Sequence, residues 1–233
     1  MILNIPERKI EREKEKVVAK CETCSSINTN IAELCSRCKK KMLLISRFAE
    51  SNIPIKYWFL SMDDFIGDPV LLKKYKEISD NMKSIYDDGI CICFAGSHGV
   101  GKTMAISNIL KRVVGVGFSA LYVTMNDIIA NLLYNTSMDK LAFRNELLLV
   151  DFLAIDEFDP RYMGSKDASD LFGRNIEDIF RNRVQNNLPI FMSTNSPNVT
   201  KSFEGSVGQS ISSLMNYAEI VPVLGKDRRK EGK

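Results

Sequence analysis

Apolar residues along most of the chain gather in short runs that alternate with longer amphipathic stretches. Five runs have the length of buried strands, and they cover residues 90–95, 119–125, 152–156, 189–194 and 219–225. Helical spacing of apolar residues follows each of the first four runs, at 102–114, 128–135, 167–187 and 206–217. Because apolar strands joined by helices favour a parallel sheet with helices on both faces, the pattern predicts an α/β fold with five parallel strands.

The part of the chain before this alternation has a different character. Residues 7–20 interleave acidic and basic side chains, which is typical of a solvated helix with ion pairs between successive turns. A helix that docks on a partner is the alternative. Residues 42–56 have the character of a connector, because Pro54 disfavours helical backbone at the residue before it. Residues 69–86 have the apolar spacing of one amphipathic helix that ends before Gly89.

Four cysteines near the N-terminus form two CxxC pairs. Cys21 and Cys24 make the first pair, Cys35 and Cys38 the second, and ten residues separate the pairs. Two such pairs can close a tetrahedral zinc shell, and a segment this short has little apolar core with which to fold unaided. A full set of cysteine ligands leaves no open position for catalysis. We therefore predict a small module with structural zinc, and four unconnected thiols are the alternative.

Composition adds few limits on function. The 233 residues are 45% hydrophobic and 26% charged with a net charge of +3, which is ordinary for a globular protein and gives no bulk attraction to polyanions. No apolar run reaches the ~18 residues of a membrane helix, and the N-terminus lacks a secretory signal, so we expect a cytoplasmic protein with no membrane partner. In that reducing setting Cys91 and Cys93 are expected to be buried strand thiols. Basic clusters at 37–41 and 226–230 could contact phosphates or simply be solvated.

A glycine-rich segment between the first strand and its helix matches the pattern GxxxxGK[ST]. The predicted ATP-binding residues of this P-loop are Gly96, Ser97, His98, Gly99, Val100, Gly101, Lys102 and Thr103. Backbone N–H groups of such a loop wrap the phosphates, while Lys102 is expected to bridge the β- and γ-phosphates and Thr103 to ligate Mg²⁺. His98 fills an unspecified position, so a catalytic role for it is not favoured. A purely structural glycine turn is the alternative.

Acidic and polar residues end the third and fourth predicted strands. Asp156 is expected to hold the Mg²⁺ of bound ATP, and Glu157 to orient and deprotonate the attacking water. Ser193, Thr194 and Asn195 end the fourth strand, where a side chain could contact the γ-phosphate or that water, and Asn195 is the expected contact. We therefore predict that Glu157, Lys102 and Asn195 are catalytic. An acidic loop that arises by chance, and an ordinary Asn-Ser-Pro turn, are the alternatives.

The P-loop, LAIDEF at 153–158, STNSP at 193–197 and VLGKDRRK at 223–230 together resemble the AAA+ ATPases of the DnaC/DnaI helicase-loader group and the related IstB transposition helpers. The resemblance covers roughly residues 54–229. It implies an ATPase that binds ATP and single-stranded DNA and engages a replicative DNA helicase through the zinc module. We accordingly expect an N-terminal helix and zinc module at 1–41, a linker at 42–56, an AAA+ domain at 57–225 and a basic tail at 226–233.

One segment departs from the family pattern. Loaders usually carry arginines in the helix after the sensor strand, one of which reaches the ATP of a neighbouring subunit, but residues 205–217 contain none. Arg174, Arg181 and Arg183 on the preceding helix are candidates for that role, although a solvated helix residue is the favoured interpretation of each one. We expect slow ATP hydrolysis by the isolated chain, together with nucleotide-dependent self-association.

Three other functions are compatible with parts of the sequence. An IstB-like transposition helper would act on duplex DNA, but the zinc module favours the loader. A small-molecule P-loop kinase is disfavoured by the glutamate beside Asp156. An adaptor that uses ATP only for assembly would not need Glu157 for its function.

Overall fold

The computed structural model describes residues 5–25, 33–67, 69–134, 136–158, 168–196 and 217–227. The predicted helix at 206–217 lies outside the described residues except for its last position, and the tail is described only as far as Asp227. No helix in the described ranges is both long enough and apolar enough to cross a membrane.

Five strands in the described part of the chain form one sheet, and all neighbouring strands are parallel. Their bounds are β1 Cys91–Ala95, β2 Ala120–Thr124, β3 Phe152–Asp156, β4 Ile190–Thr194 and β5 Ala218–Pro222. In space the order is β2-β3-β4-β1-β5. The register pairs Thr124 with Asp156 and Ala95 with Thr194, so the carboxyl ends of these strands meet at one edge. The predicted α/β fold with five parallel strands is confirmed.

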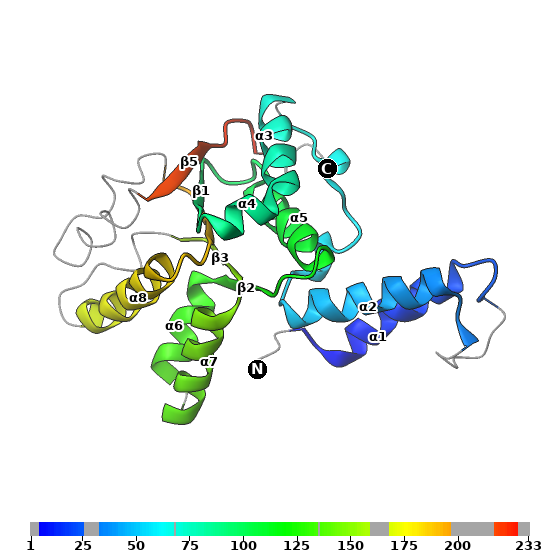
Figure 1. Ribbon diagram of the computed structural model, residues 1–233, viewed down its shortest axis with the longest axis horizontal. Helices are drawn as coiled ribbons and strands as arrows, with labels where there is room; N and C mark the ends of the chain where they lie inside the picture. The colour runs from blue at the N-terminus through cyan, green and yellow to red at the C-terminus, as the bar shows by residue number, and fades with distance from the viewer. Residues whose placement is uncertain are drawn as a thin grey trace.

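Helices cover both faces of the sheet (Figure 1). Three helices pack on one face, namely α3 Pro69–Asp80, α4 Met82–Asp87 and α5 Lys102–Gly115. The other face carries α6 Met125–Tyr134, α7 Ser137–Leu149 and α8 Ala168–Gln185. The single helix predicted at 69–86 is in fact two, because Asn81 leaves the helical region with φ −104° and ψ 24°. The helix α7 was not predicted from the sequence.

Strand residues divide between two cores by simple alternation. On β1, Ile92 and Phe94 join the core under α3 to α5, while Cys91 and Cys93 join the core under α6 to α8. All four side chains are at most 4% exposed, so both thiols are buried in the strand as predicted. A strand covered on both faces has no polar side, which explains why these strands occur in the sequence as continuous apolar runs.

Two antiparallel helices precede the sheet domain and project away from it (Figure 1). They are α1 Glu7–Ala19 and α2 Ser36–Glu50. Ile10 of α1 and Ile45 of α2 are both buried, and α1 carries two ion pairs between residues three apart. Residues 42–50, interpreted above as part of a connector, form the C-terminal half of α2, because Pro54 acts only beyond the end of that helix.

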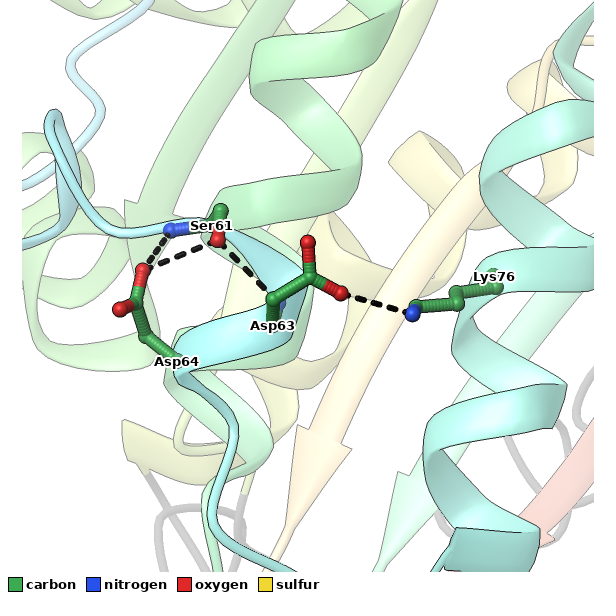
Figure 2. A network of polar contacts seen from close by, with 4 residues as sticks. All are labelled: Ser61, Asp63, Asp64 and Lys76. Carbon is green, nitrogen blue, oxygen red and sulfur yellow. Dashed lines mark hydrogen bonds and ion pairs between the residues drawn. The ribbon is translucent and has the colours of Figure 1, made fainter.

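A lead-in segment, residues 55–67, joins α2 to α3 and lies against the start of α5. It contains two short 3-10 helices, η2 Ile55–Tyr57 and η3 Met62–Asp64. Lys111 of α5 donates hydrogen bonds to the carbonyls of Tyr57 and Trp58, at 2.6 and 3.3 Å. Figure 2 shows the capping box in which Asp64 accepts from the backbone N–H of Ser61, beside the ion pair of Asp63 with Lys76. These contacts hold the lead-in segment against α3 and α5.

Candidate nucleotide site at the carboxyl edge of the sheet

The P-loop connects β1 to α5 and is held from both sides by neighbouring strands. The N–H of Gly96 donates to the carbonyl of Thr194 on β4 at 3.1 Å. A Cβ atom at Gly96 would lie 2.0 Å from the carbonyl oxygen of Val223, which follows β5, so no side chain fits there. Gly101 has φ +102°, a left-handed backbone angle that glycine adopts without steric cost. The motif glycines are therefore demanded by close backbone packing and by the turn itself.

Lys102 is folded back into the loop and is only 6% exposed. Its Nζ donates to the carbonyls of Gly96 and Ser97 at 2.8 and 2.7 Å. A third hydrogen bond, of 2.9 Å, reaches Oδ1 of Asn195 at the end of β4. Two residues predicted to be catalytic from separate parts of the sequence are thus in direct contact. The ammonium is held by neutral oxygens that phosphate oxygens could replace.

Asp156 ends β3 and is 3% exposed, with hydrogen-bond donors on both carboxylate oxygens. Its Oδ1 accepts from the hydroxyl of Ser193 and, at 3.0 Å, from the N–H of Glu157. Its Oδ2 accepts from the hydroxyl of Tyr122 at 2.6 Å. Burial and the charge of Asp156 raise the pKa of Tyr122, so this hydroxyl keeps its proton and remains a donor. The carboxylate is held in one orientation at the edge of the sheet.

Glu157 turns the chain sharply just after β3 and has an exposed side chain. Its φ of +55° lies in the left-handed region, which is costly for a residue with a Cβ atom. Its N–H points back toward Ser193 Oγ at 3.2 Å, and the next N–H donates to the carbonyl of Ser193 at 2.7 Å. The turn thus separates two adjacent carboxylates, one buried and fixed, the other exposed.

The remaining P-loop residues fall into two groups. Val100 is buried at 2% exposure and anchors the loop in the core, whereas Ser97 and His98 are exposed. Thr103 lies in the first turn of α5, next to Lys102, and is half-buried. The ring of Phe65 from the lead-in segment lies so close to Gly101 that a Cβ there would be 2.7 Å from Cε2. The lead-in segment therefore borders the P-loop directly.

Neither a protein-family model nor a curated protein matches the sequence. Solved structures do match. DnaI shares 20% identity over 76% of this chain and 94% of its own, with a TM-score of 0.62. The DnaC helicase loader shares 20% identity over 73% of this chain and all of its own (100%), with a TM-score of 0.59. The replication initiator DnaA bound to AMPPCP and single-stranded DNA shares 18% identity over 75% and 51% of the two chains, with a TM-score of 0.60.

The chain has the AAA+ fold of the DnaC and DnaI proteins. It spans about half the length (51%) of the DnaA structure that it matches. Identities near 20% carry the fold and leave activity to be argued from the site itself.

The four N-terminal cysteines come together outside the AAA+ sheet. Their sulfur atoms all lie within 4.8 Å of one another, and the Sγ atoms of Cys21 and Cys35 are 3.9 Å apart. Zinc–sulfur bonds of about 2.3 Å in a tetrahedron place sulfurs about 3.8 Å apart, so the residues present fit a zinc ion. A hydrogen bond from Cys38 and the N–H of Cys24 lower the pKa of Cys21 to about 6, which makes one thiolate available near neutral pH.

One of the three arginines considered for a role between subunits belongs to the interior of the AAA+ fold. Arg183 is fully buried, and its guanidinium donates to four backbone carbonyls at 2.8 to 3.0 Å, those of Leu147, Val150, Asp151 and Pro189. It therefore ties the end of α7 to the starts of β3 and β4, and its candidacy was wrong. Arg181 is exposed and pairs with Glu177 at 2.6 Å, and Arg174 is exposed.

Two residues of the site have a role that was not predicted from the sequence. Ser193 and Tyr122 both donate to Asp156. A signal for Ser193 exists, because it is the first polar residue in the apolar run 189–194. Tyr122 gives none, since a tyrosine within an apolar strand is more typical of core packing.

Proposed function

We propose that this chain is an ATP-dependent loader of a replicative DNA helicase, which binds ATP with Mg²⁺ and contacts single-stranded DNA. The observation that carries the proposal is the meeting of Lys102, Asn195 and Asp156 at one edge of a sheet with the fold of DnaI and the DnaC helicase loader. A cysteine cluster at the N-terminus of the same chain supports it, because it provides a separate module for a protein partner.

Each site residue has a distinct chemical task in this proposal. The P-loop N–H groups and Lys102 bind the β- and γ-phosphates, and Thr103 and Asp156 hold Mg²⁺, which would neutralise phosphate charge when bound. Glu157 is placed at an exposed turn, where its carboxylate can take a proton from the attacking water. Asn195 supplies an amide that can orient this water or sense the γ-phosphate. Lys102 and Asn195 already share a hydrogen bond, so they can respond to phosphate together.

Partner binding is assigned to other parts of the chain. We assign helicase binding to the cysteine module within residues 1–41, and phosphate contacts with DNA to the basic residues at 37–41 and 226–230. Residues 57–225 are the proposed AAA+ domain. The AAA+ domains of two chains would associate when ATP is bound. With Arg183 buried in the fold, the exposed Arg174 is the better candidate to reach a neighbour's ATP. Slow hydrolysis in isolation follows if that neighbour is absent.

A reconstituted loading reaction tests the proposal. A hexameric bacterial replicative helicase is incubated with single-stranded DNA coated by a binding protein, and unwinding of a downstream duplex is measured. Separate reactions receive the parent chain, the Lys102→Ala variant or the Glu157→Gln variant. The parent chain with ATP should stimulate unwinding, and Lys102→Ala should not. Tight nucleotide-dependent binding to duplex DNA without any effect on the helicase would instead favour the transposition helper.

A further inference from the structure

Tyr122 connects Asp156 with the residues that end α2, which lie far apart in the sequence. It is 6% exposed on β2, and its hydroxyl donates to Oδ2 of Asp156 at 2.6 Å. In the parallel register Tyr122 pairs with Ala154, two residues before Asp156, so both side chains project from the same face of the sheet. The tyrosine side chain therefore extends diagonally from β2 to the buried carboxylate at the end of the neighbouring strand β3.

The backbone of the same residue is bound from the opposite side. β2 is an edge strand, and the N–H of Tyr122 donates to the carbonyl of Ser51 at 2.8 Å. The side-chain amide of Asn52 donates to the carbonyl of Tyr122 at 3.0 Å. Asn52 holds a left-handed backbone with φ +53°, and both residues are buried. The edge of the sheet is thus completed by the residues that end α2.

The helix α2 extends this connection to the cysteine cluster. Cys35 is its N-cap and Cys38 lies in its first turn, whereas Ser51 is its C-cap. One rigid helix therefore has the cysteine cluster at its first residues and the backbone partners of Tyr122 at its last. The hydroxyl of Tyr122 completes a continuous path of bonded groups from that helix to Asp156.

We propose that Tyr122 is a positioning residue, which orients Asp156 for magnesium–nucleotide binding and ties that carboxylate to the end of α2. The inference rests on the proposed function of the site. Three hydrogen bonds fix the carboxylate plane, and without the hydroxyl Oδ2 loses its donor, so the group is free to rotate away from the nucleotide. Phenylalanine would fill the same core space, so packing alone does not require the hydroxyl, whose burial is unfavourable without a partner.

The molecule contains its own matched control for a lost tyrosine hydroxyl. Tyr75 is fully buried under the same face of the sheet, and its hydroxyl has no hydrogen-bond partner among the described residues. Tyr75→Phe therefore removes the same atom from the same core without affecting the site. Asn52→Gly is the complementary change, since glycine tolerates the left-handed backbone and lacks the side chain whose amide donates to the carbonyl of Tyr122.

The test measures the affinity of the full chain for a fluorescent ATP analogue, first in metal-stripped buffer and then with Mg²⁺ added. The ratio of the second affinity to the first is called the magnesium gain. Tyr122→Phe should reduce this magnesium gain by about 10- to 100-fold, because loss of a group that orients a metal ligand weakens metal affinity by that factor. The affinity measured without magnesium should be unchanged. Tyr75→Phe should match the parent chain, and Asn52→Gly should show a smaller loss. A full magnesium gain in Tyr122→Phe overturns the assignment, and a full gain in Asn52→Gly overturns the tie to α2.

A second measurement does not depend on nucleotide. The thermal unfolding shift caused by Tyr122→Phe should shrink in an Asp156→Asn background, because the hydroxyl's charged partner is gone. Equal shifts in both backgrounds would overturn the contact. If the parent chain shows no magnesium gain, the proposed function fails as well. A parent gain retained by Tyr122→Phe removes only this inference.

Discussion

The left-handed backbone at Glu157 places the proposed base where its side chain is exposed, while the N–H of the same residue holds Asp156. A residue with a Cβ atom loses roughly 1 to 2 kcal/mol in this conformation, which glycine does not. The turn therefore lowers the stability of the fold but sets the position of the Glu157 carboxylate. Such an exchange is typical of residues that act on a bound ligand.

Replacement of Glu157 separates these two effects. Glu157→Gly should raise the free energy of unfolding by up to about 1 kcal/mol and abolish ATP hydrolysis. Glu157→Gln should leave stability and ATP affinity near those of the parent chain while also abolishing hydrolysis. Urea unfolding and a phosphate-release assay give the two readouts. Hydrolysis retained in either variant would remove Glu157 from the proposed role.

Arg183 is a charged residue whose importance lies in folding. Arg183→Met fills most of its volume but removes one donor from each of four carbonyls, of which that of Pro189 still accepts from the N–H of Leu153, so we expect a loss of at least about 3 kcal/mol in unfolding free energy. Arg181→Ala, two positions earlier on the exposed face of α8, should change stability by less than about 0.5 kcal/mol. Chemical denaturation compares them. Similar values for the two variants would contradict the internal role of Arg183.

At the scale of elements, the P-loop depends on the segment that follows β5. A Cβ at Gly96 would overlap the carbonyl of Val223, whereas one at Gly115 in the last turn of α5 meets nothing within 4 Å. Gly96→Ala should therefore abolish nucleotide binding and destabilise the fold, and Gly115→Ala should stabilise it by up to about 1 kcal/mol. Melting temperature and ATP affinity report both effects. Unimpaired ATP binding by Gly96→Ala would contradict the packing.

The sequence was sufficient to predict elements whose signal is local. Each strand covered on both faces is a continuous apolar run, and the P-loop motif lies within eight residues, so spacing alone located them. The path of the connections was harder. The C-terminal half of α2 was interpreted as a connector because Pro54 follows it closely, and α7 has only two buried residues, Phe143 and Leu147, to mark its inner face.

Contacts made across the fold were not predictable in the same way. Arg183 looks like any helix arginine until α7, β3 and β4 bring carbonyls around it. Tyr122 looks like a core residue until the register of β2 and β3 places it beside Asp156. Both depend on which elements are neighbours in space, and one sequence does not specify that. The motif residues were predictable because their chemistry and their spacing coincide.

At the scale of the whole molecule, the C-terminal segment returns to the nucleotide site. A Cβ at Gly99 would lie 1.8 Å from Oδ1 of Asp227, so this carboxylate is adjacent to the P-loop. Its charge repels a triphosphate, so Asp227→Asn should bind ATP several-fold more tightly, most clearly at low salt. Glu11→Gln removes the same charge from the projecting α1 and should have no effect. Equal affinities for Asp227→Asn and the parent chain would exclude this repulsion.

Removal of metal should destabilise the cysteine module and leave the AAA+ domain folded. The cysteine cluster has little core of its own, with Cys24, Leu34 and Cys38 as its buried centre, whereas the AAA+ sheet is buried on both faces. If zinc supplies the folding energy of the module, a zinc-selective chelator should lower helicity from α1 and α2 while ATP still binds. Circular dichroism and fluorescent nucleotide binding follow the two parts.

The cysteine variants sharpen this test. Metal analysis should find about one zinc per chain in the parent and in Cys91→Ala, whose thiol lies in β1, and none in a Cys24→Ser, Cys38→Ser double variant. The double variant should lose helicase binding yet keep magnesium-free ATP affinity. Because the residues that end α2 also bind the backbone of Tyr122, the magnesium gain of the double variant should fall toward that of Asn52→Gly. Full helicase binding without zinc would place the partner surface elsewhere on the chain.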